Sequence, residues 1–509
     1  MSDSRTKNTK RNLYSGFIRQ IVNIILPFLT RTMILYIMGE QYVGVGSLFS
    51  SILQVLNLAD LGFSSAVIYV LYKPIAESDY VSICAIMAYL KKVYRIVGMI
   101  IFGLGISLLP FLPNFISGGY PAEMNIYVLY VLYLVGTVIS YLFFAYKSAL
   151  LTAMQRADIV SNISTVTSIL LRIMQIGVLL LLQNIYLYVA CSIVTTLINN
   201  ILLQIMSKKH FPEIMPTGKI SVETHALLTK QIKGIVVNRI GDAARNSLDN
   251  IVLSSLLGLT AVTVYGNYYY IYQALYNIAL TITRAMQPSV GNSVAKETVD
   301  KNYADYRKFT YIFACLTGWM SICMACLYQP FMKIWMRGND DLLLSVGNML
   351  LFCLYFYAIN MNNMRNLYVN ANGLYWELRP WYLLEAVGNL VLNLGLGYLF
   401  GVSGILWATI ITIFLFNFLS RTNVLFRHYF KRSPKGIYRE HLTYFSAIVV
   451  IGALTYFLCY ILPFSEIPGL VLRAAICVIF PVAVWSAISW KTEKFQNMLK
   501  TIKVLLIRK

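Results

Sequence analysis

Four charged residues lie within an apolar stretch that is long enough to cross a membrane as a helix. The stretch runs from Gly234 to Gly258 and contains Arg239, Asp242, Arg245 and Asp249. Placing such a charge at the centre of a bilayer costs roughly 2.5–3.5 kcal/mol on insertion scales. At about 100° per residue the four side chains share one helix face. The segment therefore predicts a polar environment inside a helical bundle, in a protein that handles a polar compound.

Two interpretations of this polar face are open. It could form the wall of a hydrophilic cavity, with the arginines available to an anionic group. It could also be an internal ion-pair network, because Asp242 lies three residues from both arginines and Asp249 lies four residues after Arg245. The two can coexist, since an arginine in a cavity must be held in place.

Further charged residues lie in other apolar stretches. Arg31 and Arg172 are deep in their stretches, whereas Arg19 and Arg284 are close enough to the inner face to snorkel. The planar guanidinium binds two oxygens of a phosphate at once, so an arginine excess indicates an anionic substrate. The candidate substrate-binding set is Arg19, Arg31, Arg172, Arg239, Arg245 and Arg284; the candidate coupling or ion-pair carboxylates are Asp60, Asp242, Asp249 and Glu385.

Two further patterns have both a functional and a packing interpretation. Tyr272 and Tyr276 belong to a run of tyrosines on one helix face and could stack on sugars, although core packing also explains them. Glu385, Asn389 and Asn393 follow one another at intervals of four residues, as expected for polar contacts between helices.

The composition is that of a membrane protein. Of 509 residues, 58% are hydrophobic and 12% are charged, against about 25% charged residues in soluble proteins. Apolar runs of about 20 residues recur, and a barrel would instead show alternating segments of about 10 residues. We expect an all-α polytopic protein with about fourteen spans: Leu13–Gly39, Val43–Tyr72, Ile96–Leu112, Asn125–Tyr146, Ile159–Leu182, Ile185–Met206, Gly234–Leu257, Ala261–Met286, Phe309–Ile334, Leu342–Met364, Pro380–Phe400, Val402–Ser420, Leu442–Leu462 and Gly469–Trp490.

The basic residues that produce the net charge of +21 are distributed as the topology of these spans would require. If the N-terminus is cytoplasmic, most Lys and Arg fall in inner segments, which is the positive-inside rule. This places both termini in the cytoplasm. The basic groups would then contact anionic lipid, and no nucleic acid is expected as a partner.

The longest polar interval, residues 207–233, predicts a cytoplasmic linker between two halves. The spans after it repeat features of the first two spans, as in transporters built from internal repeats. We therefore expect a six-helix lobe over 1–206, the linker, a second six-helix lobe over 234–435, and two further helices with a basic tail over 436–509. The two lobes would surround a central cavity.

No motif for an enzyme or a cofactor is present. The sequence has no P-loop, no G-x-S-x-G and no H-E-x-x-H. Cys323 and Cys326 form a C-x-x-C inside a span, which we interpret as packing, and the four His residues have no ligand spacing. We expect no catalytic residues, no metal and no cofactor.

Several short stretches resemble one known family, the polysaccharide and O-antigen flippases of the multidrug/oligosaccharidyl-lipid/polysaccharide exporter superfamily. The similar stretches are Ser247-Leu-Asp-Asn-Ile-Val-Leu-Ser, Leu257-Gly, Val264-Tyr-Gly-Asn-Tyr, Leu71-Tyr-Lys-Pro-Ile-Ala, Pro288-Ser-Val-Gly-Asn, and Asn372-Gly with Asn389 and Gly404. The resemblance implies a two-lobed helical transporter with a cationic cavity. Members of that family move undecaprenyl-pyrophosphate-linked sugar repeat units to the outer leaflet.

The leading hypothesis is therefore a flippase in the bacterial cytoplasmic membrane that moves a lipid-linked oligosaccharide by alternating access. Its partners would be this lipid, membrane lipids, and a polysaccharide polymerase and glycosyltransferases of the same pathway. The alternatives are a flippase for the peptidoglycan precursor, a multidrug exporter of the same superfamily, and a membrane polysaccharide polymerase or ligase.

The charged seventh span yields a direct prediction. Reversing one charge, in Arg239→Glu or Arg245→Glu, should abolish export and leave membrane insertion intact, because an anionic substrate would be repelled. Export is measured as surface polysaccharide, and insertion as protein in the membrane fraction. Unimpaired export in both variants would remove this span from the mechanism.

Overall fold

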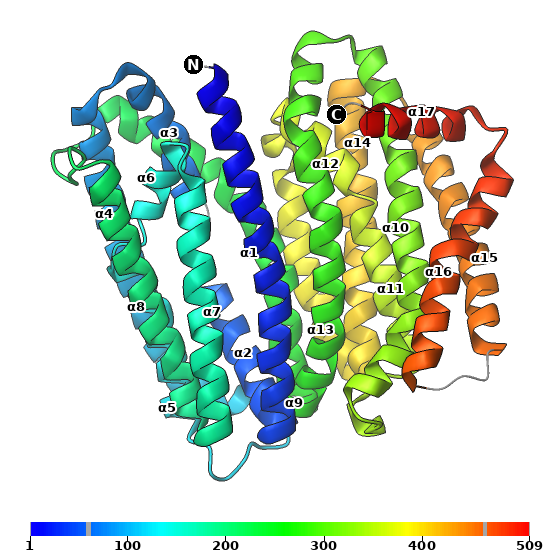
Figure 1. The fold of residues 1–509 in the computed structure, drawn as a ribbon, viewed down its shortest axis with the longest axis horizontal. Coiled ribbons are helices and arrows are strands. Elements are labelled where there is room, and N and C mark those ends of the chain that lie inside the picture. Colours follow the sequence, from blue (N-terminus) through cyan, green and yellow to red (C-terminus); the bar gives the residue numbers. More distant parts are fainter. Residues whose placement is uncertain (1, 58–62, 462–465, 508–509) are drawn as a thin grey trace. The chain divides into compact units, whose positions relative to one another are not determined.

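The computed structural model describes the backbone of residues 2–57, 63–461 and 466–507. Side chains are described for the same ranges except residues 2–18, 65, 230–246, 466 and 501–507. In these ranges every regular element is a helix, which confirms the all-α prediction (Figure 1). Helices are the expected answer to an apolar environment, because each satisfies its own backbone hydrogen bonds.

Contacts between residues divide the chain into two compact units, Met1–Thr263 and Val264–Lys509. The boundary lies inside the long helix α9. The helices of the first unit are α1 (Ser2–Ile37), α2 (Glu40–Leu56), α3 (Phe63–Glu77), α4 (Tyr80–Ser107), η2 (Leu109–Phe115), α5 (Ile126–Leu142), α6 (Lys147–Ala153), α7 (Ala157–Leu181), α8 (Ile185–His210) and the first part of α9 (Val222–Lys296).

The second unit contains the rest of α9 and the remaining helices. These are α10 (Val299–Trp335), η3 (Asp340–Leu342), α11 (Val346–Asn360), α12 (Asn363–Asn372), α13 (Tyr375–Thr412), η4 (Ile413–Ser420), α14 (Arg421–Leu425), η5 (Phe426–Phe430), α15 (Lys435–Ile461), α16 (Glu466–Ser489) and α17 (Glu493–Ile507). The expected partition into residues 1–206, 207–233, 234–435 and 436–509 remains a prediction.

The described residues contain nine helices that are long and apolar enough to span a membrane, or up to eleven when two bent pairs are counted as spans. Two of the nine are interrupted by a glycine with non-helical backbone angles, Gly258 in α9 and Gly401 in α13. Each glycine lies between two of the fourteen expected spans. The expected span Val43–Tyr72 includes residues outside the described range. The protein is thus a multi-pass membrane protein.

Some boundaries differ from the expected ones. The third span was expected from Ile96, but α4 already begins at Tyr80, where Asp79 caps it by accepting a hydrogen bond from the Ser82 amide. Lys91, Lys92 and Arg95 had suggested an inner loop; they lie within α4 instead. The expected linker, residues 207–233, is largely helical and is irregular only between His210 and Val222.

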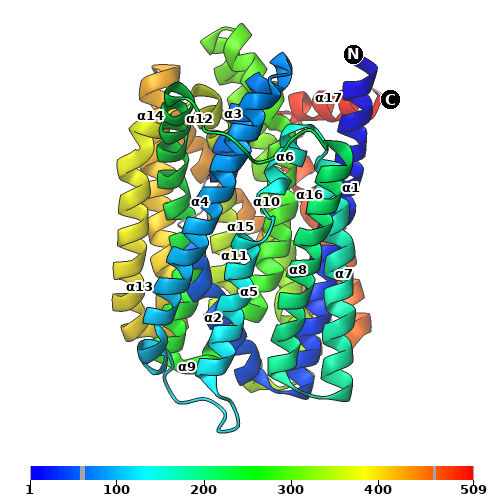
Figure 2. The same ribbon diagram turned by 90° about the vertical axis from the view of Figure 1, so that its left-hand side faces the viewer.

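Each unit has its own core. In the first, α7 packs against α1 and α8, and α5 packs against α8, as both views show (Figures 1 and 2). Phe49 of α2 meets Tyr130 of α5 edge to face, with ring centroids 5.3 Å apart. In the second, α10 packs against α11, α15 and α16. The long α10 thereby connects the C-terminal pair, α15 and α16, to the rest of its unit.

A close approach beside the bend at Gly401 gives a stability prediction. A Cβ at Gly404 would lie 1.9 Å from the Leu396 carbonyl oxygen, whereas a Cβ at Gly395 on the same helix would meet nothing within 4 Å. Gly404→Ala should therefore destabilise the protein by about 1–3 kcal/mol. The measurement is the melting temperature of purified protein in detergent. Gly395→Ala is the control; an equal melting temperature for both variants would contradict the packing argument.

Candidate functional site

Two of the expected arginines, Arg31 on α1 and Arg172 on α7, lie in the first unit, and both donate hydrogen bonds to neutral groups there. Arg172 Nη1 donates to Gln175 Oε1 at 2.7 Å and to Thr30 Oγ1 at 3.3 Å. Arg31 donates from Nη1 to Ser47 Oγ at 3.4 Å and from Nη2 to the Thr263 carbonyl at 3.5 Å. Because Thr30 and Arg31 are consecutive on α1, this short segment of α1 connects the two arginines.

The two residues that accept hydrogen bonds from Arg172, Gln175 and Thr30, are themselves held in place by their surroundings. Gln175 is buried and donates from Nε2 to the Tyr188 carbonyl at 3.3 Å, so its amide oxygen points toward the guanidinium. Thr30 is also buried. Among the described residues no carboxylate lies within salt-bridge distance of Arg172, and its side chain is only partly buried. Its positive charge is therefore positioned without being neutralised by an acid of the described chain.

In the described part of the seventh span, several polar residues are buried within the first unit. Asn250 donates from Nδ2 to Ser51 Oγ on α2 at 2.9 Å, and Asp249 is buried. Ser247 and Ser254 are fully buried in the same region. The side chains of Arg239, Asp242 and Arg245, and residue Asp60, lie outside the described residues, and their roles stay predictions.

The second unit contains a buried ionic cluster that links α12, α13, η4 and α14. Glu385 accepts hydrogen bonds from Asn417 Nδ2 at 3.3 and 3.4 Å and forms an ion pair with Arg421. Arg365 donates to Asn362 Oδ1 at 2.7 Å and to the side-chain and carbonyl oxygens of Asn417. All five side chains are at most 3% exposed. The set contains two guanidinium groups and one carboxylate, which pairs with Arg421, so it carries a net positive charge.

The polar residues that follow Glu385 on α13 connect the two halves of this bent helix. Asn389 donates from Nδ2 to Thr409 Oγ1 at 3.2 Å, and Asn393 donates from Nδ2 to Asn389 Oδ1 at 3.2 Å. These contacts favour the packing interpretation of the Glu385, Asn389 and Asn393 pattern. Asn360, Asn362 and Asn363, which precede this helix in the sequence, are also buried.

The remaining expected residues occupy different environments. Arg284 is exposed and Arg19 is partly buried, as snorkelling side chains near the end of a span would be. Tyr272 is buried and stacks on Tyr355, with centroids 4.5 Å apart, and on Tyr276, at 6.2 Å. The ring neighbours of Tyr272 favour core packing over sugar stacking for this residue. Sugar stacking by Tyr276 stays a prediction.

Sequence reasoning missed Arg365 and Arg421 because each directly follows the end of an expected span. Met364 ends the tenth expected span and Ser420 ends the twelfth, so the two arginines counted as inner flanking charges under the positive-inside rule. The helices continue past both points and bury them. The asparagine-rich run around Arg365 was an available signal, since buried amides often accompany a buried guanidinium.

Long apolar helices in two units, bent at glycines within spans, define a polytopic helical membrane fold. No protein-family model matches the sequence, and no curated protein matches it. Solved structures do match. The lipid II flippase MurJ, in an inward closed conformation, is 14% identical with a TM-score of 0.69, covering 94% of this chain and 98% of its own.

Two MATE transporters are also similar in structure. A mutant of VcmN from Vibrio cholerae is 11% identical with a TM-score of 0.60, covering 84% of this chain and 100% of its own. An inward-facing multidrug resistance MATE transporter of the MOP superfamily is 14% identical with a TM-score of 0.61, covering 80% and 97%. The chain therefore has the fold of MOP superfamily transporters and flippases, where MOP is the multidrug/oligosaccharidyl-lipid/polysaccharide exporter superfamily.

We predict that breaking the buried ion pair of this cluster lowers the stability of the protein much more than breaking an exposed ion pair. Glu385→Ala would leave Arg421 buried without its carboxylate and should destabilise the second unit by about 3–5 kcal/mol. Glu77→Ala breaks the exposed pair with Lys73, whose side chains are 58% and 83% exposed, and should cost less than about 1 kcal/mol. The melting temperatures of the purified variants test this, and equal values would show that the cluster does not stabilise the fold.

Proposed function

We propose that the protein is a flippase that translocates undecaprenyl-pyrophosphate-linked oligosaccharide repeat units across the bacterial cytoplasmic membrane, with both termini in the cytoplasm. The fold supports a transporter of this superfamily. The observation that carries the choice of an anionic substrate is the environment of Arg172, which is held by Thr30 and Gln175 and by no described carboxylate.

The proposed binding step follows from the chemistry of arginine. A guanidinium with neutral partners keeps its full charge and some of its five donors for a ligand. Its planar fork matches two oxygens of a phosphate. Arg31 and Arg172 would bind the pyrophosphate group, and Arg239 and Arg245 would extend the cationic surface. The lipid tail would remain in the bilayer during translocation.

The negative charge of the proposed substrate indicates which energy source could drive its translocation. The sequence has no P-loop, so hydrolysis of a nucleotide by this chain is not proposed. A membrane potential that is negative inside favours outward movement of an anion by about 2.3 kcal/mol per charge for each 100 mV. Among the candidate coupling carboxylates, Glu385 already accepts bonds from Asn417 and Arg421.

A flippase for the peptidoglycan precursor is the main alternative, and one observation favours it. The match to the lipid II flippase covers 94% of this chain, whereas the two MATE matches cover 84% and 80%. A multidrug exporter of organic cations would be better served by unpaired acids than by arginines. A polymerase or ligase is a further alternative, with less support because enzymatic motifs are absent from the sequence.

The role of Arg172 is tested by Arg172→Gln, which removes the charge and keeps a polar side chain. Transport of a lipid-linked repeat unit in proteoliposomes should fall by tenfold or more, because the attraction for pyrophosphate is lost. Arg172→Lys should be intermediate, since the charge stays and the fork is lost. Arg439→Gln, at an exposed position outside the candidate substrate-binding set, is the matched control. Full transport by Arg172→Gln would remove this arginine from the site.

Deletion in the native host distinguishes the candidate substrates. Loss of the protein should cause lipid-linked repeat units to accumulate on the cytoplasmic leaflet and should deplete surface polysaccharide, with growth retained. Normal surface polysaccharide together with loss of viability would instead support the peptidoglycan precursor as the substrate. Normal polysaccharide with increased sensitivity to organic cations would support a multidrug exporter.

A further inference from the structure

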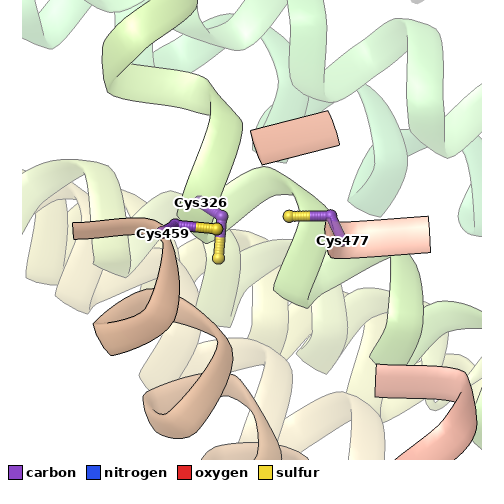
Figure 3. Close-up of side chains that lie close together, drawn as sticks. All are labelled: Cys326, Cys459 and Cys477. Carbon is purple, nitrogen blue, oxygen red and sulfur yellow. The ribbon is translucent and has the colours of Figure 1, made fainter. Parts of the chain in front are cut away.

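Three cysteines from three different helices of the second unit meet in the core. Cys326 lies on α10, Cys459 near the end of α15, and Cys477 on α16 (Figure 3). Their sulfur atoms all lie within 4.8 Å of one another, and each residue is at most 3% exposed. None of the three was expected from sequence spacing, because they come from distant parts of the chain.

The size of this sulfur triangle suits a bound ion. A metal–sulfur bond of about 2.3 Å places three sulfurs around a central ion roughly 4 Å apart. The observed separations reach this arrangement with shifts of less than about 1 Å by that estimate. A disulfide would require two of the sulfurs to approach to about 2.05 Å and would leave the third unused.

The number and the chemical type of the ligands indicate which metal ion the site would bind. Thiolates are soft ligands that select copper(I) or zinc. Zinc almost always takes four ligands in a structural site. Within the described chain no His or carboxylate joins the three sulfurs. Cys323, one turn earlier on α10, donates to the Cys477 carbonyl oxygen at 3.7 Å and is not among the three cysteines whose sulfurs all lie within 4.8 Å of one another. A three-sulfur site in an apolar core therefore favours copper(I).

An arginine beside the three cysteines could offset the negative charge that thiolates bound to copper(I) would carry. Arg473 on α16 donates from Nε to the Cys459 carbonyl oxygen at 3.1 Å, which places its guanidinium next to this cysteine. When copper(I) binds, the thiols release protons, as metal binding to cysteine requires. One copper(I) with two thiolates carries a single negative charge, which Arg473 can balance while the third cysteine contributes its sulfur as a thiol.

We propose that Cys326, Cys459 and Cys477 form a binding site for one thiophilic ion, copper(I), which clamps α15 and α16 to α10. The three cysteines belong to the second unit, whereas Arg31 and Arg172 belong to the first. The clamp would hold the C-terminal helix pair on the core of the second unit. This inference does not depend on which substrate the protein translocates.

The test uses the full-length protein, purified in detergent under anaerobic, reducing conditions and titrated with copper(I) against a chromophoric chelator. The expected result is one copper(I) bound per chain, a higher melting temperature, and an X-ray absorption spectrum that shows only sulfur neighbours. Cys326→Ala, Cys459→Ala and Cys477→Ala should each weaken binding at least 100-fold. Cys353→Ala is the matched control, because Cys353 is buried in the same unit on α11 and lies outside the cluster.

Several outcomes would overturn the assignment. The chelator could keep all copper(I) in the presence of the unaltered protein, or Cys353→Ala could lose binding as strongly as the cluster variants. The reduced protein could ignore copper(I) and, on exposure to air, form a disulfide between two of the three cysteines, seen as a loss of two hydrogens by mass spectrometry; the cluster would then be a redox pair. If an alanine variant does not fold, the stoichiometry and the absorption spectrum of the unaltered protein decide the question.

Discussion

The cost of a charge in a low-dielectric environment is the constraint on which the rest of this structure depends. Each ionic or strongly polar group inside a span must find partners in the protein, because lipid provides none. In the second unit this requirement is met by an acid, since Arg421 pairs with Glu385. In the first unit it is met by hydroxyl and amide groups, which satisfy Arg172 without cancelling its charge. This difference is the reason for proposing Arg172, and not Arg421, as a ligand-binding residue.

Hydrophobicity alone predicted the class of fold and nearly every span, because a helix must be about 20 apolar residues long to cross the bilayer. Gly258 and Gly401 were expected between spans, and their backbone angles do bend the helices there. The start of α4 at Tyr80 was missed because Lys91, Lys92 and Arg95 suggested a loop, although a helix that extends beyond the membrane can carry such charges.

The candidate site could be predicted only in part, for a physical reason. Periodicity shows which residues share a face of one helix, but it does not show which helices are neighbours. Arg31 and Arg172 were chosen for their depth in the membrane, yet their link through Thr30 depends on the packing of α1 against α7. The three cysteines show the same limit, since Cys326, Cys459 and Cys477 have no common spacing and meet only because α10, α15 and α16 pack together.

The hydrogen bonds of these arginines also bear on how a transporter of this fold could move. Alternating access is largely a rigid-body motion of one helical bundle against another. A bundle that moves must keep its buried charges satisfied throughout, because an arginine that lost its partner would be left uncompensated in an apolar environment. The described bonds of Arg31 and Arg172 go to groups of the first unit, and those of Arg365 and Arg421 go to groups of the second. A rigid-body motion of either unit would therefore leave these described bonds intact.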